Sequence, residues 1–513
     1  MVFYVVYLPY LLAVLCILSR AVSGVVRNVS IAQGQSTDRL VFSHFIIGIT
    51  GDRRFASDYD DDMKRAKSVG IDAFALNIGV DAHTDVQLQL AYNSAANNDM
   101  KVFISFDFNW WDVEQAVQVG QKVTQYASRP AQLLVDDKVF VSSFGGDGLN
   151  VTALREAVGR PIFFAPNFHP SYGTDLSLVD GLLNWMAWPS NGKNKAPTPG
   201  NSISVADGDQ IYINALSGKA YIAPVSPWFF THFGPEVSYS KNWNFPSDLL
   251  WFDRWNEVLV LKPRFIEILT WNDFGECHYT GPLKSPHTDN GASKWVNDIC
   301  LRPHNGWLDI SKPFIAAFKA GDASPNPHIS YDELVYWYRP TPRGVDCDST
   351  DTCMVLANNG SGDYFLGRPD GWQYMQDSVF VVSLLTSPAT VRINSGGTVY
   401  SYDTLAGANS REVPMGVGTQ SFEVLRNGRT ILSGTSLKQI VNGCVCGLYN
   451  FNAYVGTLPD GLSDPLRPGG LAAFEQGLNV HNCHATPSLG IIPHPNITTQ
   501  STVSIAPVNS PAK

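Results

Sequence analysis

The sequence predicts a mixed α/β fold: a (β/α)₈ TIM barrel followed by a smaller all-β, sandwich-like module. Three observations support this. From about residue 40, short apolar segments alternate with amphipathic helical segments, which is typical of βα units on a parallel sheet. Eight such segments occur, and eight is the strand number of this barrel. After residue 325 the pattern changes to short β-like segments separated by turn residues.

The eight apolar segments are rich in Val, Ile, Phe and Ala, as strands buried on both faces should be. Along the chain they are residues 41–49, 73–78, 102–108, 139–144, 162–168, 184–188, 220–225 and 265–270. The same alternation also suits an open, doubly wound sheet, and the sequence leaves this alternative open.

Two of the helices between these strands have readable limits. Thr84 and Gln87 form a capping-box pattern, and apolar residues then recur on one helical face up to Asn97. A second helix opens at Ser247 and is stopped by Pro263. Two tryptophans lie on its apolar face, and we expect both in the core.

The second half predicts strands at 379–385, 391–393, 399–402 and 422–432. The last contains Asn427-Gly428, a dipeptide that favours a tight hairpin because it accepts positive φ at both positions. The expected organisation is a signal peptide at 1–24, an N-terminal lead-in at 25–38, the catalytic barrel at 39–325, a β-rich accessory module at 326–488 and a flexible Ser/Thr/Pro tail at 489–513.

Composition excludes several classes of protein. Basic residues number 36 against 46 acidic ones, the formal net charge is −10, and no Lys/Arg run occurs, which excludes a nucleic-acid partner. Hydrophobic residues make up 44% and aromatic residues 12%, so the chain is neither disordered nor a multi-span membrane protein. We expect a monomer that uses no cofactor and no metal.

The N-terminus predicts export. An apolar run over 2–18 is followed by small residues that suit cleavage before Val25, after which nothing would hold the protein to a membrane. No basic residue precedes Arg20, so an uncleaved anchor is the alternative. We expect a secreted protein, extracellular or associated with the cell wall. Glycosylation sequons stand at Asn28, Asn150, Asn359 and Asn496.

Seven cysteines remain outside the signal, which contains Cys16. Because exported proteins form disulfides, we expect local pairs, with one thiol left over or a further bridge that cannot be guessed. The expected pairs are Cys347 with Cys353, and Cys444 or Cys446 with Cys483. Cys444, Cys446 and Cys483 could also form a zinc site with His481, but the spacing of these ligands is poor and we do not favour it.

Acidic residues stand where two of the barrel strands end. The segment Trp-Asn-Asp-Phe-Gly-Glu at 271–276 follows the eighth strand and carries Asp273 and Glu276, and Asp107 ends the third strand among aromatic residues. Active sites of barrels lie at these strand ends, and apolar rings raise the pKa of a neighbouring carboxyl group. One acid can then donate a proton while another stays ionised, as glycosidic bond hydrolysis requires. The plainer interpretation is that Asp273 caps its loop and Glu276 is solvated.

Aromatic and polar residues near the same strand ends suit a sugar, whose C–H faces pack on rings while its hydroxyl groups form hydrogen bonds. The residues expected to bind substrate are His44, Asn77, Trp110, Trp188, Trp228, Trp271 and Asn272. Core packing is the alternative for each single ring. Three strand-end histidines, His44, His169 and His232, are the basis of a competing hypothesis, a metal-dependent hydrolase.

At these residues the sequence resembles glycoside hydrolase family 71, the fungal α-1,3-glucanases or mutanases. The matching stretches are 41–45, 70–77, 103–107 and 271–276, and the similarity extends from about residue 40 to 485. The resemblance implies an endo-acting, inverting hydrolase of α-1,3-glucan in which Asp273 and Glu276 are central and Asp107 assists. We favour Glu276 as the acid and Asp273 as the base, with the reverse order left open. A wall protein that binds carbohydrate without cutting it is the remaining alternative.

Overall fold

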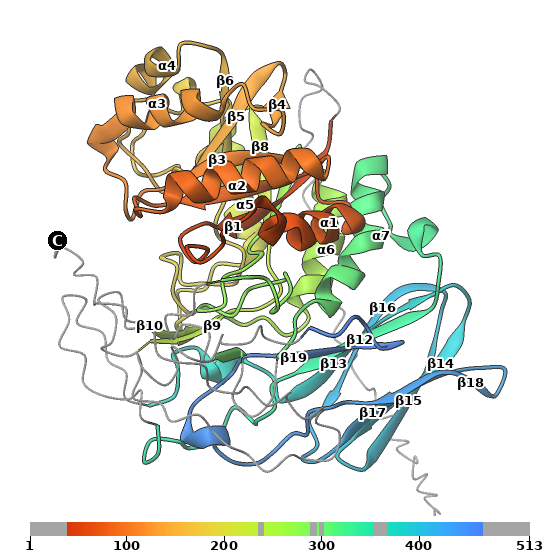
Figure 1. Ribbon diagram of the computed structural model, residues 1–513. Helices are drawn as coiled ribbons and strands as arrows, with labels where there is room; N and C mark the ends of the chain where they lie inside the picture. Colours follow the sequence, from red (N-terminus) through yellow and green to blue (C-terminus); the bar gives the residue numbers. More distant parts are fainter. Residues whose placement is uncertain (1–37, 234–240, 288–294, 297–301, 352–366, 465–513) are drawn as a thin grey trace, which may run out of the picture. The chain divides into compact units, whose positions relative to one another are not determined.

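Figure 1 shows the computed structural model, which describes residues 38–233, 241–287, 295–296, 302–351 and 367–464. These residues all belong to one compact unit, Ser36–Lys513. The expected signal peptide and tail lie outside the described residues. So do Cys16, Cys300, Cys353, His481 and Cys483, and the sequons at Asn28, Asn359 and Asn496.

The first half folds around one nine-stranded sheet. Its strands are β1 (Leu40–Ile46), β2 (Ala73–Ile78), β3 (Lys101–Asp107), β4 (Leu134–Val135), β5 (Lys138–Phe144), β6 (Ile162–Phe164), β7 (Gly181–Leu183), β8 (Ala220–Val225) and β11 (Phe265–Ile268). Every neighbouring pair is parallel except β4 with β5. Seven of the eight expected strands are confirmed, with ends that differ by a few residues.

The sixth expected strand, 184–188, is wrong. The strand β7 ends at Leu183, one residue before the predicted start. Asn184 Oδ1 then accepts a hydrogen bond from the backbone N–H of Met186 at 2.9 Å, and this local turn replaces the ladder bonds of a strand. An apolar run that looks like a strand is therefore a loop at the carboxyl edge of the sheet, the edge where the parallel strands end.

The order of the strands follows the sequence. From β6 it runs through β5, β3, β2, β1, β11 and β8 to β7, so β1 lies beside the last parallel strand. A doubly wound sheet places consecutive strands outward from a central switch point instead, and the observed order contradicts that alternative. The coarse prediction, a mixed α/β fold with further all-β sheets, is confirmed.

The helices of the described residues are α1 (Asp60–Val69), α2 (Thr84–Asn97), α3 (Ala116–Tyr126), α4 (Val151–Val158), α5 (Val205–Leu216), α6 (Leu250–Leu261) and α7 (Gly306–Ala320). The two expected helices are α2 and α6, and Trp251 and Trp255 of α6 are fully buried as predicted. The capping box at Thr84 is wrong, because Thr84 is already the first helical residue and the N-cap is His83, which makes no side-chain cap bond. None of these helices is long and apolar enough to cross a membrane.

The second half contains two four-stranded antiparallel sheets. One consists of β16 (Gly407–Pro414), β13 (Ser378–Leu385), β12 (Glu333–Tyr338) and β19 (Tyr454–Leu458), and the other of β15 (Thr398–Thr404), β14 (Ala389–Ser395), β17 (Gln420–Arg426) and β18 (Arg429–Thr435). Apolar side chains from both sheets form one cluster, in which Tyr336 stacks on Phe422 at 3.9 Å. The hairpin at Asn427-Gly428 is confirmed, with φ of 52° and 75°. The strands β12, β16 and β19 had no counterpart among the predicted segments.

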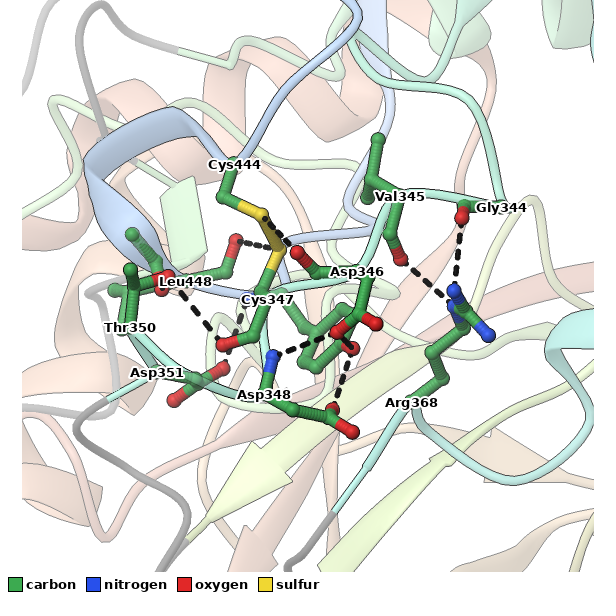
Figure 2. The surroundings of a disulfide bond; sticks show 12 residues. Gly344, Val345, Asp346, Cys347, Asp348, Thr350, Asp351, Arg368, Cys444 and Leu448 are labelled. Atoms are coloured by element: carbon green, nitrogen blue, oxygen red, sulfur yellow. Dashed lines mark hydrogen bonds between the residues drawn. A yellow bond between two sulfur atoms is a disulfide. The ribbon is translucent and has the colours of Figure 1, made fainter.

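A disulfide joins Cys347 to Cys444, so the expected pairing of Cys347 with Cys353 is wrong (Figure 2). The two cysteines are 97 residues apart, and the fold rather than proximity in sequence brings them together. This bond also removes Cys444 from the zinc site that the sequence analysis set aside. Cys446 is disulfide-bonded as well, whereas Cys277 is a free, buried thiol.

Candidate active site

The loop after β11 carries two acids and a histidine in one cluster. His278 Nε2 lies 3.2 Å from Asp273 Oδ2 and 3.2 Å from Glu276 Oε2, so the imidazole bridges the two carboxylates. The backbone N–H of Glu276 donates to Asp273 Oδ1 at 2.9 Å, which fixes the tight turn between the acids. Burial lowers the pKa of His278, but the two carboxylates outweigh burial and raise it to about 9. The ring is therefore a cation at neutral pH.

A short hairpin brings a lysine to the same cluster. The strand β9 (Phe230–Phe233) pairs with β10 (Lys241–Asn244), and Lys241 Nζ forms an ion pair with Glu276 Oε1. The backbone N–H of Phe230 donates to the Glu276 carbonyl oxygen at 3.1 Å, so the hairpin is bonded to the acid loop at two points. Burial raises the pKa of Glu276, yet Lys241 and His278 outweigh burial and hold this pKa well below its ordinary value.

Asp107 ends β3 at the same carboxyl edge. The backbone N–H of Asn109 donates to its Oδ1 at 2.9 Å, and Asn77, at the end of neighbouring β2, bonds to it through its side chain. Burial raises the pKa of Asp107, and these bonds and the charges of His44 and Lys241 oppose the rise without cancelling it. Asp107 thus lies at the same edge of the sheet as the acid loop, and the charge of Lys241 acts on it as well as on Glu276.

His44 continues the site toward the interior of the sheet. Its Nδ1 lies 2.8 Å from Oε1 of Glu267 on β11, and both side chains are buried. The imidazole packs edge-on against Trp185, with 4.9 Å between the ring centroids. Trp185 in turn packs edge-on against Phe144 at 4.6 Å. The histidine expected to bind substrate is therefore held by a carboxylate on one side and an indole on another.

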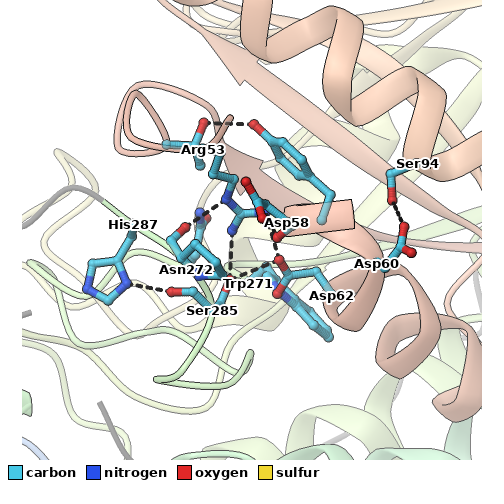
Figure 3. Close-up of polar contacts among 12 residues, drawn as sticks. Arg53, Asp58, Asp60, Asp62, Ser94, Trp271, Asn272, Ser285 and His287 are labelled. Carbon is cyan, nitrogen blue, oxygen red and sulfur yellow. Dashed lines mark hydrogen bonds and ion pairs between the residues drawn. The ribbon is translucent and has the colours of Figure 1, made fainter. Parts of the chain in front are cut away.

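The first two residues of the acid loop are firmly anchored (Figure 3). Trp271 Nε1 donates to Asp62 Oδ1 at 2.9 Å, and Asp62 forms a buried ion pair with Arg53 at 2.9 Å. Asn272 bonds to the backbone of Ile46 twice, accepting from its N–H at 2.8 Å and donating to its carbonyl oxygen at 3.1 Å. The first turn of α1 and the end of β1 therefore fix where the acid loop starts.

The residues expected to bind substrate fall into two groups. His44 and Asn77 lie near strand ends and are themselves buried, whereas Trp110 lies beyond a strand end and is 59% exposed. The other four are buried, and each bonds its polar group within the protein: Trp188 to Trp228, Trp228 to Phe451, Trp271 to Asp62 and Asn272 to Ile46. Core packing describes these four, because they leave no ring face or amide at the surface.

Three ligand atoms of the acid loop come close enough together for a metal ion. Asp273, Glu276 and His278 each offer one, all within 4.8 Å of one another, and no other such group occurs in the described part of the chain. The ammonium group of Lys241 already neutralises Glu276, and His278 carries a proton where a metal would need a lone pair. The negative charges of Asp273 and Glu276 are therefore compensated by the positive charges of Lys241 and His278.

The three histidines of the metal hypothesis do not form one site. His44 bonds to Glu267, whereas His169 Nδ1 bonds to Ser171 Oγ at 2.7 Å. His232 is buried between Asn242 and Asp351, with its Nε2 3.0 Å from Asp351 Oδ2. Each imidazole thus has its own partners on different segments.

Four residues of the site are missing from the sequence analysis: Lys241, His278, Glu267 and Trp185. His278 had a signal, because it stands only two positions after Glu276 in the same loop. Glu267 had one as well, as a charged residue inside an apolar strand. Lys241 had none, since its hairpin meets the acid loop only in the folded chain.

The sequence matches the family described as glycosyl hydrolase family 71 over residues 37–466. A mutanase from Penicillium rubens is 42% identical over 432 residues, which cover 83% of this chain and 90% of the relative. A glucan endo-1,3-α-glucosidase from Schizosaccharomyces pombe is 36% identical over 445 residues, covering 82% and 95%. An ascus wall endo-1,3-α-glucanase from the same yeast is 29% identical over 448 residues, covering 81% and 96%.

Similarity to solved structures is weak. The GH99 endo-α-mannosidase from Bacteroides thetaiotaomicron is 12% identical, with a TM-score of 0.37 over 52% of this chain and 80% of that one. The family match, in contrast, covers most of the chain, and two relatives above 30% identity align with more than 80% of it. The protein is therefore a glycoside hydrolase and belongs to glycosyl hydrolase family 71.

Proposed function

We propose that the protein hydrolyses α-1,3-glucosidic bonds within α-1,3-glucan, with inversion at the anomeric carbon. The observation that carries this proposal is the cluster of Asp273 and Glu276 with His278 and Lys241, at the carboxyl edge of the parallel sheet where Asp107 ends β3. The names of the three relatives support the substrate. Inversion needs one carboxylic acid and one carboxylate, and the cluster offers carboxyl groups in different environments.

The surroundings of the acids support roles other than the expected order, which made Glu276 the acid. Glu276 is ionised beside Lys241 and His278, as a base that activates water must be. Asp107 keeps its proton to a higher pH than an ordinary aspartate, as an acid that protonates the leaving oxygen must. Asp273 holds the imidazolium of His278 against Glu276. In this proposal Asp273 supports the base and does not activate water itself.

We also propose that the curled sheet closes as a (β/α)₈ barrel within residues 39–325. In the strand order β6 and β7 lie at opposite ends, although the chain passes directly from one to the other. Two backbone hydrogen bonds link these ends, from the N–H of Asp180 to the Phe164 carbonyl oxygen and from the N–H of Leu183 to the Pro166 carbonyl oxygen, both at 2.9 Å. These two bonds support closure of the sheet between β6 and β7, although the two strands do not form a regular ladder of hydrogen bonds.

The proposal extends to the whole chain. The barrel and the β-rich module at 326–488 act together as a monomer, exported after removal of residues 1–24, on polysaccharide outside the cell or in the wall. The substrate and the wall association rest on the relatives, one of which is named for the ascus wall. Mass analysis of the protein from culture medium tests export: a chain that begins at Val25 supports it, and a chain retained in the membrane contradicts it.

Substrates with different leaving groups separate the acid from the base. On an α-1,3-linked gluco-oligosaccharide, Asp107→Asn and Glu276→Gln should each lower kcat by about 100-fold or more. On α-glucosyl fluoride, Asp107→Asn should keep most of its activity, because fluoride leaves without a proton, whereas Glu276→Gln should stay inactive. Glu423→Gln is the control, since Glu423 pairs only with Arg392 at the surface. A wild-type protein that releases no reducing sugar from α-1,3-glucan contradicts the proposed function.

The first product tests the stereochemistry. Inversion of an α-bond releases a β-anomer first, which NMR of a freshly started reaction detects before mutarotation. Release of the α-anomer first would contradict the inverting assignment while leaving the hydrolase function intact.

A further inference from the structure

Glu267 is a buried carboxylate whose second oxygen has no partner. It lies on β11 in register with Phe42 of β1, and the other members of β11 are Phe265, Ile266 and Ile268. Its side chain is 0% exposed, and Oε2 finds no hydrogen-bond partner in the described part of the chain. Charged groups in such surroundings are costly and occur mostly where they have a task.

The layer beneath Glu267 shows how unusual this position is. Side chains that alternate along β11 share a face, so Phe265 lies on the same face as Glu267. Phe265 packs against the rings of Phe42, Phe140 and Phe163, which together with it belong to one apolar cluster. If the side chain at position 267 served only to pack the next layer of the core, it would be apolar too. The carboxylate instead pairs with His44 on the neighbouring strand β1.

The contact with His44 indicates what task Glu267 has. Glu267 Oε1 lies 2.8 Å from His44 Nδ1, which places the proton on Nδ1 and leaves Nε2 as the nitrogen directed away from Glu267. The charge of His44 acts on Asp107, as one of the influences that limit the rise in its pKa. Trp185 packs edge-on against the ring, so His44 is constrained by a carboxylate and an indole at once. Such carboxylate–imidazole pairs orient a histidine toward its target.

We propose that Glu267 is a positioning residue, which fixes the ring orientation and the protonated nitrogen of His44 within the proposed site. This inference rests on the proposed hydrolase function for its effect on turnover, but not for its effect on His44. The pair lies on β1 and β11, next to the strands β2 and β3 that carry Asn77 and Asp107. Four neighbouring strands thus supply these polar side chains.

Glu267→Met tests the inference, because methionine keeps the length of the side chain and suits the apolar surroundings. It should lower kcat by about 10- to 100-fold, the usual loss when an orienting partner is removed. It should leave KM unchanged, and the midpoint of thermal unfolding should fall no further than in His44→Gln, since both changes remove the same buried hydrogen bond. In a His44→Gln background the same change should cost nothing further, because its effect passes through His44.

Glu333→Met is the matched control. Glu333 is also a buried glutamate on a strand, β12, and its Oε2 also lacks a partner among the described residues. Among the described residues no histidine bonds to it, so the change should leave kcat as in the wild type. If Glu333→Met lowers kcat as much as Glu267→Met, or if the losses of Glu267→Met and His44→Gln simply multiply, the positioning role is contradicted.

A measurement without substrate separates this inference from the proposed function. ¹⁵N NMR of the histidine side chains shows which ring nitrogen carries a proton, and His44→Gln identifies the signals of His44. Nδ1 should be protonated in the wild type and unprotonated in Glu267→Met. An unchanged nitrogen pattern overturns the inference even in an active enzyme, whereas the expected change in a protein inactive on α-1,3-glucan overturns only the proposed function.

Discussion

Lys241 sets the charge state of Glu276, and removing it should change how activity depends on pH. Lys241→Met takes away the ammonium group that opposes burial, so the lowered pKa of Glu276 should rise. A base works only when ionised, so the acidic limb of the kcat/KM profile should move to higher pH. Lys241→Arg should largely restore the profile, and Lys312→Met, which breaks an ion pair with Asp309 on α7, should leave it in place. An unmoved acidic limb in Lys241→Met would show that Glu276 is not the base.

Two tryptophans that look alike in the sequence should respond differently to replacement. Trp110 is 59% exposed, so Trp110→Ala should weaken binding of α-1,3-glucan while the free energy of unfolding stays within about 0.5 kcal/mol of the wild type. Trp271 is fully buried and donates to Asp62, so Trp271→Ala should destabilise the fold by about 3–5 kcal/mol. Pelleting with the polymer and urea unfolding measure the two effects. Normal binding by Trp110→Ala would remove this ring from the proposed site.

The hairpin of β9 and β10 is the element that brings Lys241 to the acids, and the second half of the chain holds it in place. Asp351 Oδ2 contacts His232 of β9 at 3.0 Å and accepts from the backbone N–H of Tyr449 at 2.8 Å. Asp351 lies just beyond Cys347, in the segment that the disulfide with Cys444 fastens (Figure 2). Contacts from distant parts of the sequence therefore determine where this lysine stands.

Asp351→Asn should loosen this element. The His232–Asp351 pair is fully buried, and removing the charge of one partner from such a pair costs about 3 kcal/mol. We expect urea unfolding at a lower midpoint together with a reduced kcat, because the hairpin positions Lys241. Asp332→Asn serves as the comparison, since its pair with Arg426 is partly exposed. Unchanged kcat in a destabilised Asp351→Asn protein would limit the role of the hairpin to stability.

At the scale of the whole molecule, the two halves share one hydrophobic core. Trp337 of β12 belongs to the same cluster as Trp307 of α7, and its Nε1 donates to the Asp248 carbonyl oxygen at 2.8 Å. Trp228 Nε1 in turn donates to the Phe451 carbonyl oxygen at 3.0 Å. A chain that ends after residue 325 would expose this surface, so we expect it to aggregate or to lack a cooperative unfolding transition. A soluble, active protein of residues 25–325 would contradict this expectation.

Buried carboxyl groups should make the whole protein more stable in mild acid. Burial raises the pKa of Glu333 from 4.5 to about 7, and that of Asp248 and Asp464 to about 6 each. A raised pKa favours the protonated folded state, so this stability is present below the ordinary pKa and is lost as the pH rises through the raised values. Glu333→Gln should therefore raise the thermal midpoint at neutral pH and change it little in mild acid. An equal rise at both pH values would contradict the linkage.

The sequence determined the parts of the fold that depend on local pattern. Strands buried on both faces, the limits of α2 and α6 and the Asn427-Gly428 hairpin follow from spacing and turn chemistry within a few residues. The position of Asp107, Asp273 and Glu276 follows as well, because parallel strands end at the same edge. The prediction of a strand at 184–188 was wrong because an apolar loop and an apolar strand have the same composition. In the folded chain the side chain of Asn184 forms a turn there.

Only the tertiary structure decided what surrounds the acids. Lys241, Glu267 and His44 reach the site from elements far apart in the sequence, and Cys347 pairs across 97 residues instead of with its sequence neighbour. The pKa of a carboxyl group depends on burial and on charges within a few ångström, and neither can be read from the order of residues. The sequence therefore named the acids that we propose as catalytic groups, whereas the packing of the folded chain set the surroundings of each.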